Sequence, residues 1–380
     1  MDRFGIGQVR LPEFHIDNFR LPVFGNSSGT SGNHEIGLHE SLVDAWYFSG
    51  YSNENPPEEV VGVKGGKMAL KNFAFTLGTG FGMYHYNFRN GIIQSSVSTT
   101  PYTLKYSGDG YKNLWFMRRN GSTGSPLNYE YEAFKFKVTG LKDGASIRIH
   151  KTEYNGISQQ TDYLTDKIYE DGVYTVPGGR DSVSPAGSNY YAYVDLMMII
   201  LDDNPKDNLI TIELLPVEYE GYLCFDGVDD FAVWNSALMQ DDYTIILKRK
   251  WLDTDLAGNK ALASKRATSS LADGAFIFEK ITNDVVYSYS YGGRSGVILS
   301  QNDIVYQTAD SYNGTTPIER GSLSDTQLLG LGAGVINSLG SQFAQCAIAY
   351  FALYSRTLTT QEIEKEKVKL EAEWNKRLIK

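Results

Sequence analysis

Short runs in which apolar and polar residues alternate constrain the fold of this chain most strongly. Such runs are Phe134–Val138, Ser146–His150, Val173–Val176 and Leu209–Leu214. A period of two sends successive side chains to opposite faces of an extended strand, so that one face is buried and the other meets solvent. Turn sequences rich in Gly and Asp separate the runs, as at 140–144. The pattern predicts an all-β fold with half-buried strands.

The remainder of the chain is also strand-like until its last segment. Strands are expected at 222–225, 231–234, 243–249, 274–278, 285–291, 296–300 and 347–354. After them, Thr359 and Glu362 have the spacing of a capping box, which marks the start of a helix. Apolar residues then recur on one helical face, at Ile363, Leu370, Trp374 and Leu378. The sequence therefore predicts one C-terminal helix.

The first 24 residues contain the sequence Arg-Leu-Pro-x-Phe twice. Its fixed positions are Arg10, Leu11, Pro12 and Phe14 in one copy, and Arg20, Leu21, Pro22 and Phe24 in the other. Proline fixes its own φ and pushes the residue before it out of the helical region, so both copies should be extended. Residues 25–34 are rich in Gly and Ser, as flexible linkers are. We expect an extended arm, residues 1–24, which docks onto a partner; the alternative is a frayed terminus.

Composition excludes several classes of protein. The chain has 35 basic and 45 acidic residues and a net charge of −10, which gives no surplus positive charge for binding nucleic acid. No apolar run approaches the roughly 20 residues that cross a bilayer, and the start shows no secretory signal. We therefore expect synthesis in a cytoplasm and no membrane insertion. Cys224 and Cys346 lie in apolar contexts and are expected to be buried free thiols.

Two segments carry a family resemblance. Residues 223–231 read Leu-Cys-Phe-Asp-Gly-Val-Asp-Asp-Phe, and residues 352–363 read Ala-Leu-Tyr-Ser-Arg-Thr-Leu-Thr-Thr-Gln-Glu-Ile. In this order they resemble the signature and the closing strand of the laminin-G-like, concanavalin A-type jelly-roll family. The opening strand of that family resembles residues 37–50, which lie far upstream.

The resemblance implies a jelly-roll β-sandwich that is split in sequence. Its two parts would be residues 35–77 and 217–380, and residues 78–216 would form an inserted, second β-sandwich-like domain. First and last strands of such folds often lie close together, so residues 42–48 are expected to pair near 347–354. Interrupted jelly rolls of this kind resemble those in proteins of Bacteroidales phages and their hosts.

The sequence shows no catalytic motif. Glucanases that share the jelly-roll fold use a Glu-x-Asp-x-x-Glu run to supply two carboxyl groups, and no such run occurs here. We expect no enzyme activity and no organic cofactor. An acidic cluster, Asp226, Asp229 and Asp230, surrounds Gly227. Its carboxylates either accept backbone N–H groups within a turn or hold a calcium ion.

Aromatic residues are the candidate binding groups. Tyr287, Tyr289 and Tyr291 alternate and are expected to share one strand face. That face either packs into the sandwich or forms an exposed strip on which sugar rings stack. Trp115 and the pair Tyr190–Tyr191 are further candidates in the inserted region. Tyrosine-rich surfaces also form protein interfaces, so the strip alone does not select a ligand.

Lectin-like β-domains behind a docking arm, without a secretion signal, predict a phage virion protein. It would belong to an oligomeric tail or head fibre assembly, attach to other virion proteins through its arm, and bind host surface polysaccharide. The alternative is a bacterial glycan-binding protein, extracellular or on the cell surface, or an accessory module of a carbohydrate-active enzyme.

Overall fold

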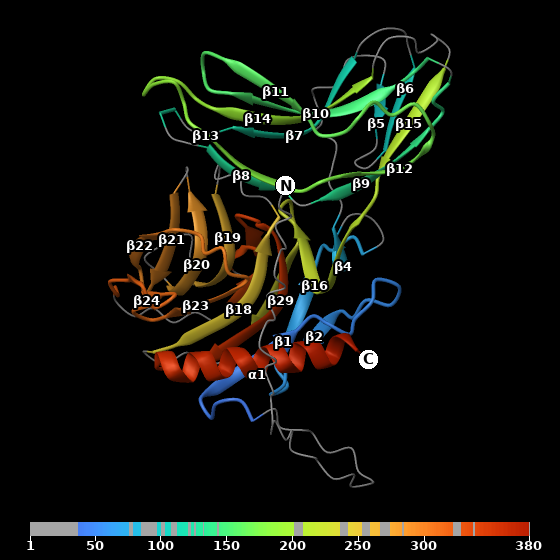
Figure 1. Cartoon of the computed structure of the whole chain (residues 1–380). Coiled ribbons are helices and arrows are strands. Elements are labelled where there is room, and N and C mark those ends of the chain that lie inside the picture. The colour runs from blue at the N-terminus through green and yellow to red at the C-terminus, as the bar shows by residue number, and fades with distance from the viewer. Residues whose placement is uncertain are drawn as a thin grey trace, which may run out of the picture. The chain divides into compact units, whose positions relative to one another are not determined.

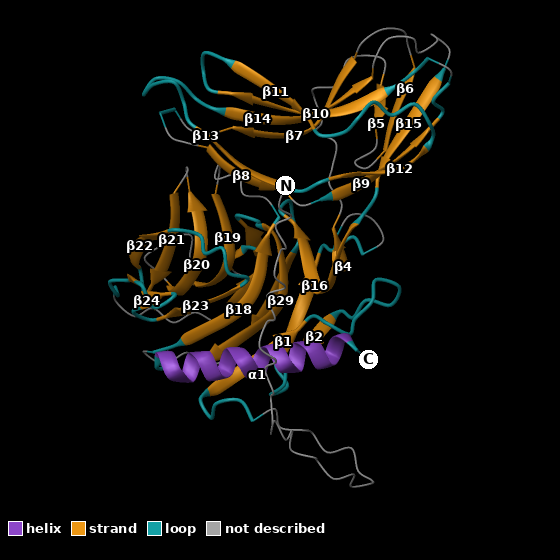
Figure 2. Cartoon of the chain, in the orientation of Figure 1, coloured by secondary structure: helices purple, strands orange, loops and turns teal. Residues whose placement is uncertain are grey.

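The structure of the protein, a computed structural model, describes most of the chain after residue 36. The described residues are 37–75, 79–84, 97–99, 103–107, 112–120, 123–124, 127–131, 133–142, 144–200, 208–235, 242–252, 259–266, 274–282, 285–321, 328–336 and 339–379. Strands dominate this part, and a helix follows the last strand (Figures 1 and 2). The predicted all-β class with a C-terminal helix is confirmed. Within these ranges no helix has the length and apolar character needed to cross a membrane.

Sheet A is one of two large antiparallel sheets. Its strands run in the order β25 (Thr316–Pro317), β24 (Ser311–Tyr312), β23 (Ile304–Thr308), β18 (Thr244–Trp251), β29 (Gln345–Tyr354), β16 (Val217–Asp226) and β4 (Gly80–Tyr84), and β1 (Leu42–Tyr47) also pairs with β29.

In sheet A, two segments that are distant in sequence share one edge of strand β29. Strand β1 pairs along it from Leu42 opposite Tyr354 to Tyr47 opposite Tyr350. Strand β16 continues along the same edge, from Leu223 opposite Ile348. The expected pairing of residues 42–48 near 347–354 is confirmed.

Sheet B is the second large sheet. Its strands run in the order β2 (Glu59–Val61), β3 (Lys67–Lys71), β17 (Phe231–Asn235), β26 (Leu328–Leu331), β19 (Asn259–Arg266), β20 (Gly274–Thr282), β21 (Val285–Ser290) and β22 (Gly293–Val297). A separate hairpin consists of β27 (Gly334–Ile336) and β28 (Leu339–Ser341).

Sheets A and B share one hydrophobic core. Trp46, Phe225 and Leu247 of sheet A belong to the same buried cluster as Phe276 and Leu331 of sheet B. This burial is the main apolar contribution to the stability of the two sheets.

The strands between residues 97 and 214 form three smaller sheets. One has the order β11 (Gln159–Tyr163), β10 (Ile147–Tyr154), β14 (Tyr193–Ile200) and β7 (Lys112–Asn120). The second has the order β12 (Gly172–Val176), β9 (Phe134–Thr139), β15 (Leu209–Leu214), β6 (Thr103–Ser107) and β5 (Val97–Thr99). The third pairs β13 (Gly179–Val183) with β8 (Leu127–Tyr131). Among the described strands, these pair only with one another.

The alternation that predicted these strands is visible in their burial. In β9, Phe134, Phe136 and Val138 are buried, whereas Lys135 and Lys137 are exposed. Each buried residue on one face lowers the free energy of the folded sheet, and each lysine on the other keeps its charge in water.

Helix α1 (Thr360–Leu378) packs on sheet A, on the side away from the shared core, and Figure 1 shows it crossing the ends of β18 and β29. Ile363, Leu370 and Trp374 are buried, and the Trp374 ring lies 5.6 Å from the ring of Tyr222 on β16. The predicted capping box is present: Thr359 accepts a hydrogen bond from the backbone N–H of Glu362, whose carboxylate accepts one from the Thr359 backbone. The predicted helix start is confirmed.

Both cysteines are free and fully buried in sheet A, as expected. Burial raises the pKa of both thiols, so they are protonated and unreactive at neutral pH.

One strand begins earlier than expected. The sequence predicts a strand at residues 296–300, whereas β22 spans Gly293–Val297. The reason is a two-residue turn after β21: Tyr291 and Gly292 have φ of 47° and 81°, as the tight hairpin turns that match strand twist require. The return strand therefore begins earlier than the sequence pattern suggested.

Candidate functional site

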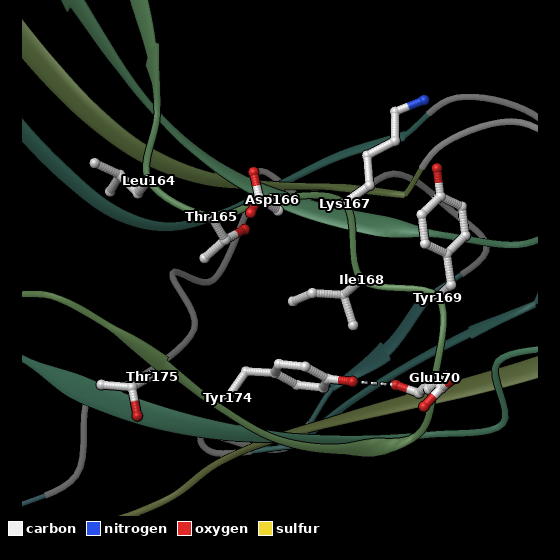
Figure 3. Close-up of a pocket in the computed structure, with 9 residues that line it drawn as sticks. All are labelled: Leu164, Thr165, Asp166, Lys167, Ile168, Tyr169, Glu170, Tyr174 and Thr175. Atoms are coloured by element: carbon white, nitrogen blue, oxygen red, sulfur yellow. Dashed lines mark hydrogen bonds between the residues drawn. The ribbon is translucent and has the colours of Figure 1, made fainter.

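An open cavity of about 460 Å³ lies beside the segment that joins β11 to β12. Its lining residues are Leu164, Thr165, Asp166, Lys167, Ile168, Tyr169, Glu170, Tyr174 and Thr175 (Figure 3). The volume falls in the range of small-molecule sites in proteins. The sequence did not predict this cavity, because its lining comes from an irregular segment without alternation of apolar and polar residues. The mixture of tyrosine and charged residues in this segment was the only sequence feature that pointed to a binding site.

Backbone hydrogen bonds to β10 hold the lining segment in place. The Leu164 N–H donates to the Ile149 carbonyl at 2.9 Å. Ile168 and Ile147 exchange two backbone hydrogen bonds, of 2.8 and 3.0 Å. The Thr165 hydroxyl accepts a further bond from the Ile149 N–H at 3.0 Å. The segment is thus fixed at both ends, and the groups between are positioned before any ligand arrives.

The cavity combines aromatic and hydrogen-bonding groups. Tyr169 is 56% exposed, and the Tyr174 hydroxyl donates to the Glu170 carbonyl at 2.6 Å. Figure 3 shows Ile168 turned toward Tyr174, whereas Lys167 and Tyr169 turn the other way. Exposed tyrosine beside carboxylates and an ammonium group suits a ligand with apolar faces and many hydroxyls, since rings stack on tyrosine while charged groups bond hydroxyls.

A second aromatic group lies at the ends of β10 and β14. The rings of Tyr154 and Tyr193 stack at 4.9 Å, and the ring of Tyr191 lies 6.2 Å from that of Tyr154. Tyr190 and Tyr191 are 42% and 50% exposed. The candidate pair Tyr190–Tyr191 is therefore accessible, which binding requires.

The acidic cluster forms the turn between β16 and β17. One Asp226 carboxylate oxygen accepts backbone N–H groups of Val228, Asp229 and Asp230, at 2.7, 3.2 and 3.3 Å. Gly227 supplies a φ of 76° within the turn. Asp226 thus accepts backbone N–H groups within the turn, which is one of the two roles expected for this cluster.

Asp230 is the buried member of this cluster. It is 1% exposed and accepts hydrogen bonds from the Thr79 hydroxyl at 2.6 Å and from the Asp226 backbone at 3.0 Å. Burial, more than the neighbouring carboxylates, raises its pKa to about 7. Burial and the Asp226 charge also raise the pKa of Asp229. One ligand atom from each of the three residues lies within 4.8 Å of the others, so calcium binding at Asp226, Asp229 and Asp230 stays a prediction.

The three alternating tyrosines do not share one face. Tyr289 is 3% exposed and packs with Ala261 and Ile277 on the outer face of sheet B, with Tyr287 beside it. Tyr291 instead points into the core between the sheets, where its ring lies 5.9 Å from that of Tyr243. The expectation of one strip is wrong for Tyr291, because it occupies the left-handed turn after β21 and leaves the strand alternation.

Some candidate residues cannot be placed. The docking arm 1–24, with both copies of its repeat, and the linker 25–34 lie outside the described residues. Trp115 lies in β7 opposite Met197, but its side chain is also outside the described part. Comparison of the chain with known protein families and with curated proteins finds no match.

Proposed function

We propose that this chain is a structural protein of a bacteriophage virion that binds host surface glycan. It belongs to an oligomeric tail or head fibre assembly and attaches through the arm that contains Arg10–Phe14 and Arg20–Phe24. The observation that carries the binding part is the open cavity at 164–175, where exposed Tyr169 stands among polar groups. Attachment is supported by the repeated motif of the arm and the flexible composition of the linker.

We also propose that the β-strands form a laminin-G-like jelly roll with an inserted second β-domain. The shared core of sheets A and B, the pairing of β1 with β29, and the Asp-rich turn after β16 support the jelly roll. The insertion is supported by strands β5–β15, which pair among themselves, and by Tyr84, which pairs with Val217 at their two ends.

A bacterial glycan-binding protein, or an accessory module of a carbohydrate-active enzyme, is the second candidate. The same cavity favours it, because sugar binding does not depend on attachment to a particle. Mass spectrometry of purified virions distinguishes the two: finding this polypeptide in the particle supports the first proposal, and its absence there supports the second.

Binding is tested with a glycan array probed by the full chain, in parallel with Tyr169→Ala. We expect the variant to bind the retained glycans roughly tenfold more weakly, because it loses an exposed stacking surface. Tyr163→Ala is the matched control, since Tyr163 is also 56% exposed but stacks under Arg148, 3.5 Å from its ring centre, outside the cavity lining. An array without signal above background would reject glycan binding.

Attachment is tested by deleting residues 1–24. We expect the shortened chain to be missing from assembled particles, while its urea unfolding curve matches that of the full chain because the contacts between the described strands are kept. Particles that incorporate the shortened chain normally would contradict the role of the arm.

A further inference from the structure

Three tyrosine rings form one aromatic surface at the ends of β10 and β14. Tyr154 and Tyr193 pair directly across the two strands, which puts their side chains on the same face of the sheet. Their rings stack at 4.9 Å. The Tyr191 ring lies 6.2 Å from the Tyr154 ring and 6.4 Å from the Tyr193 ring. We call Tyr154, Tyr191 and Tyr193 the tyrosine platform.

The loop after β10 holds the platform in place. The Tyr154 hydroxyl donates to the Gly156 carbonyl at 2.7 Å. The Asn155 side-chain oxygen accepts the Ile157 N–H at 3.0 Å. Gly156 has a φ of 98°, and a Cβ atom there would overlap Cβ of Tyr190, so the close contact with Tyr190 requires glycine. These contacts position the rings before a ligand arrives, which lowers the ordering cost of binding.

The platform is open to solvent. Tyr191 is 50% exposed, and Tyr154 and Tyr193 are partly exposed. The neighbouring Tyr190 is 42% exposed, and Ile157, in the loop after β10, is 67% exposed. Single exposed apolar residues are common on protein surfaces, but a group of them around an aromatic cluster is typical of a binding site. A ligand therefore has access to the rings without a change in the fold.

The two segments that build the platform carry no charge. Residues 154–161 and 182–194 contain no Asp, Glu, Lys or Arg, although 21% of the residues of the chain are charged. Glu153, which precedes the platform, belongs to the opposite face of β10 and pairs with Lys151 at 2.6 Å. The platform therefore offers no counter-charge to an acid or an amine, and a charged ligand would lose hydration there without compensation.

The size of the platform favours a sugar over a protein partner. Stable protein interfaces bury about 800 Å² on each partner. A fully covered aromatic side chain buries roughly 150 to 250 Å², so three partly exposed rings offer only a part of that area. The exposed amides and hydroxyls of the same segments, at Gln159, Ser188 and Asn189, suit the many hydroxyl groups of a glycan.

We propose that the tyrosine platform is a second glycan-binding site, which takes a neutral sugar. Tyr191 is the ring on which the sugar stacks, because it is the most exposed of the three. Gln159 pairs directly with Tyr154, so its amide lies on the same face and bonds the sugar hydroxyls. The choice of a glycan rests on the function proposed above; the choice of a neutral one rests on the uncharged surroundings of the platform.

This site is distinct from the cavity at 164–175. Gln159, beside the platform, is the first residue of β11, whereas Tyr163, which directly precedes the cavity segment, is the last. At about 3.4 Å per residue, the two ends of β11 lie on the order of 14 Å apart. A polysaccharide is therefore a better probe than a monosaccharide, because different units of one chain contact the two sites.

The test is native gel electrophoresis of the full chain through gels that contain a dissolved polysaccharide. The neutral probes are dextran, galactomannan, xyloglucan and galactan, and the acidic probes are polygalacturonate and alginate. We expect at least one neutral polysaccharide to slow the wild type more than either acidic one does.

Three variants locate the binding. Tyr191→Ala should bind the retained neutral polysaccharide about tenfold more weakly, as for loss of a stacking contact. Tyr191→Phe keeps the ring and should bind like the wild type. Tyr163→Ala is the control, because Tyr163 is also exposed, at 56%, but lies at the other end of β11. It should bind like the wild type as well.

Other outcomes would overturn this site. If Tyr191→Ala is slowed as much as the wild type while Tyr169→Ala is not, the glycan binds at the cavity alone and the proposed function stands. If the acidic polysaccharides slow the wild type more than the neutral ones do, the ligand is not neutral. If Tyr191→Ala converts an oligomer to a monomer in size-exclusion chromatography without changing carbohydrate binding, the platform is a protein interface. If no polysaccharide slows the wild type, the site is rejected, and the glycan array decides separately on the proposed function.

Discussion

Buried carboxylates organise several turns of this protein. Asp44, on β1, is 1% exposed and accepts backbone hydrogen bonds from Ala45, Lys64 and Gly66, of 2.7, 2.8 and 2.6 Å. A Cβ atom at Gly66 would lie 2.4 Å from an Asp44 oxygen, so the loop can approach the carboxylate only with glycine there. Asp226 and Asp230 act similarly between β16 and β17. Such groups fix loop geometry at the cost of burying a titratable group.

Asp230 makes stability depend on pH. Its ordinary pKa is 3.8 and its pKa in the folded protein is about 7, so between these values the folded chain holds a proton that the unfolded chain has released. The free energy of unfolding should therefore fall as pH rises from about 4 to 7, by on the order of 4 kcal/mol for this group. Urea unfolding of wild type and Asp230→Asn at pH 5 and pH 8 measures this change in the free energy of unfolding. The part of the decrease that is due to Asp230 should be missing in the variant.

Two comparisons sharpen the pH experiment. Asp310→Asn is the control, because hydrogen bonding to Arg320 lowers the pKa of Asp310 below 3.8, so its contribution changes only below about pH 4 and should leave the pH 5 to 8 slope unchanged. Calcium added at pH 8 should stabilise the wild type if Asp226, Asp229 and Asp230 bind it, since the metal favours ionised carboxylates. An unchanged pH slope in Asp230→Asn would contradict the assignment to Asp230.

Helix α1 lies across sheet A and connects segments that are distant in sequence. Glu366 on the helix is 1% exposed and accepts hydrogen bonds from the Tyr354 hydroxyl of β29 at 3.0 Å and from the His39 backbone at 2.9 Å. The helix therefore links the segment before β1 to the strand with which β1 pairs. The capping box and the apolar face of α1 could be recognised from sequence, but the buried Glu366 could not, because its partners lie far away along the chain.

Removing the Glu366 carboxylate should destabilise the protein. Glu366→Ala leaves the buried Tyr354 hydroxyl and the His39 N–H without their acceptor, and we expect a loss of roughly 2 to 4 kcal/mol in urea unfolding. Glu364→Ala is the control from the same helix, because Glu364 is 61% exposed and pairs with Lys367 at the surface. It should change stability by less than about 0.5 kcal/mol. Equal effects of the two substitutions would contradict the role of Glu366.

The chain leaves and re-enters sheet A at one point. Tyr84 near the end of β4 pairs with Val217 at the start of β16, and Met83 pairs with Glu218. The strands between them pair among themselves in the described part. Paired residues in an antiparallel ladder have Cα atoms only about 5 Å apart, a gap that a tight turn closes.

Residues 85–216 should therefore be replaceable by a short turn. A chain with Asn-Gly between Tyr84 and Val217 is expected to fold with one cooperative unfolding transition, because sheets A and B keep their shared core. Circular dichroism and urea unfolding measure this, with the full chain as reference. A shortened chain that is unfolded or lacks cooperativity would contradict an inserted domain.

Local structure could be predicted from residues close together in the chain. The alternation of apolar and polar residues predicted strands such as β9, and the capping box at Thr359 predicted the start of α1. Both patterns depend on residues close together in the chain. The sequence could not predict that Tyr291 leaves the alternation, because a backbone turn decides this. Nor could it reveal the cavity at 164–175.

Features that depend on contacts between distant segments could not be predicted in this way. β1 and β16, separated by about half the chain, share an edge of β29, and the burial of Asp230, Glu366 and Lys280 follows from neighbours distant in sequence. The physical reason is that sheet pairing and burial arise from non-local contacts, whereas period and capping are local. A lysine in a strand has the same sequence pattern whether its charge meets solvent, a carboxylate or another cation.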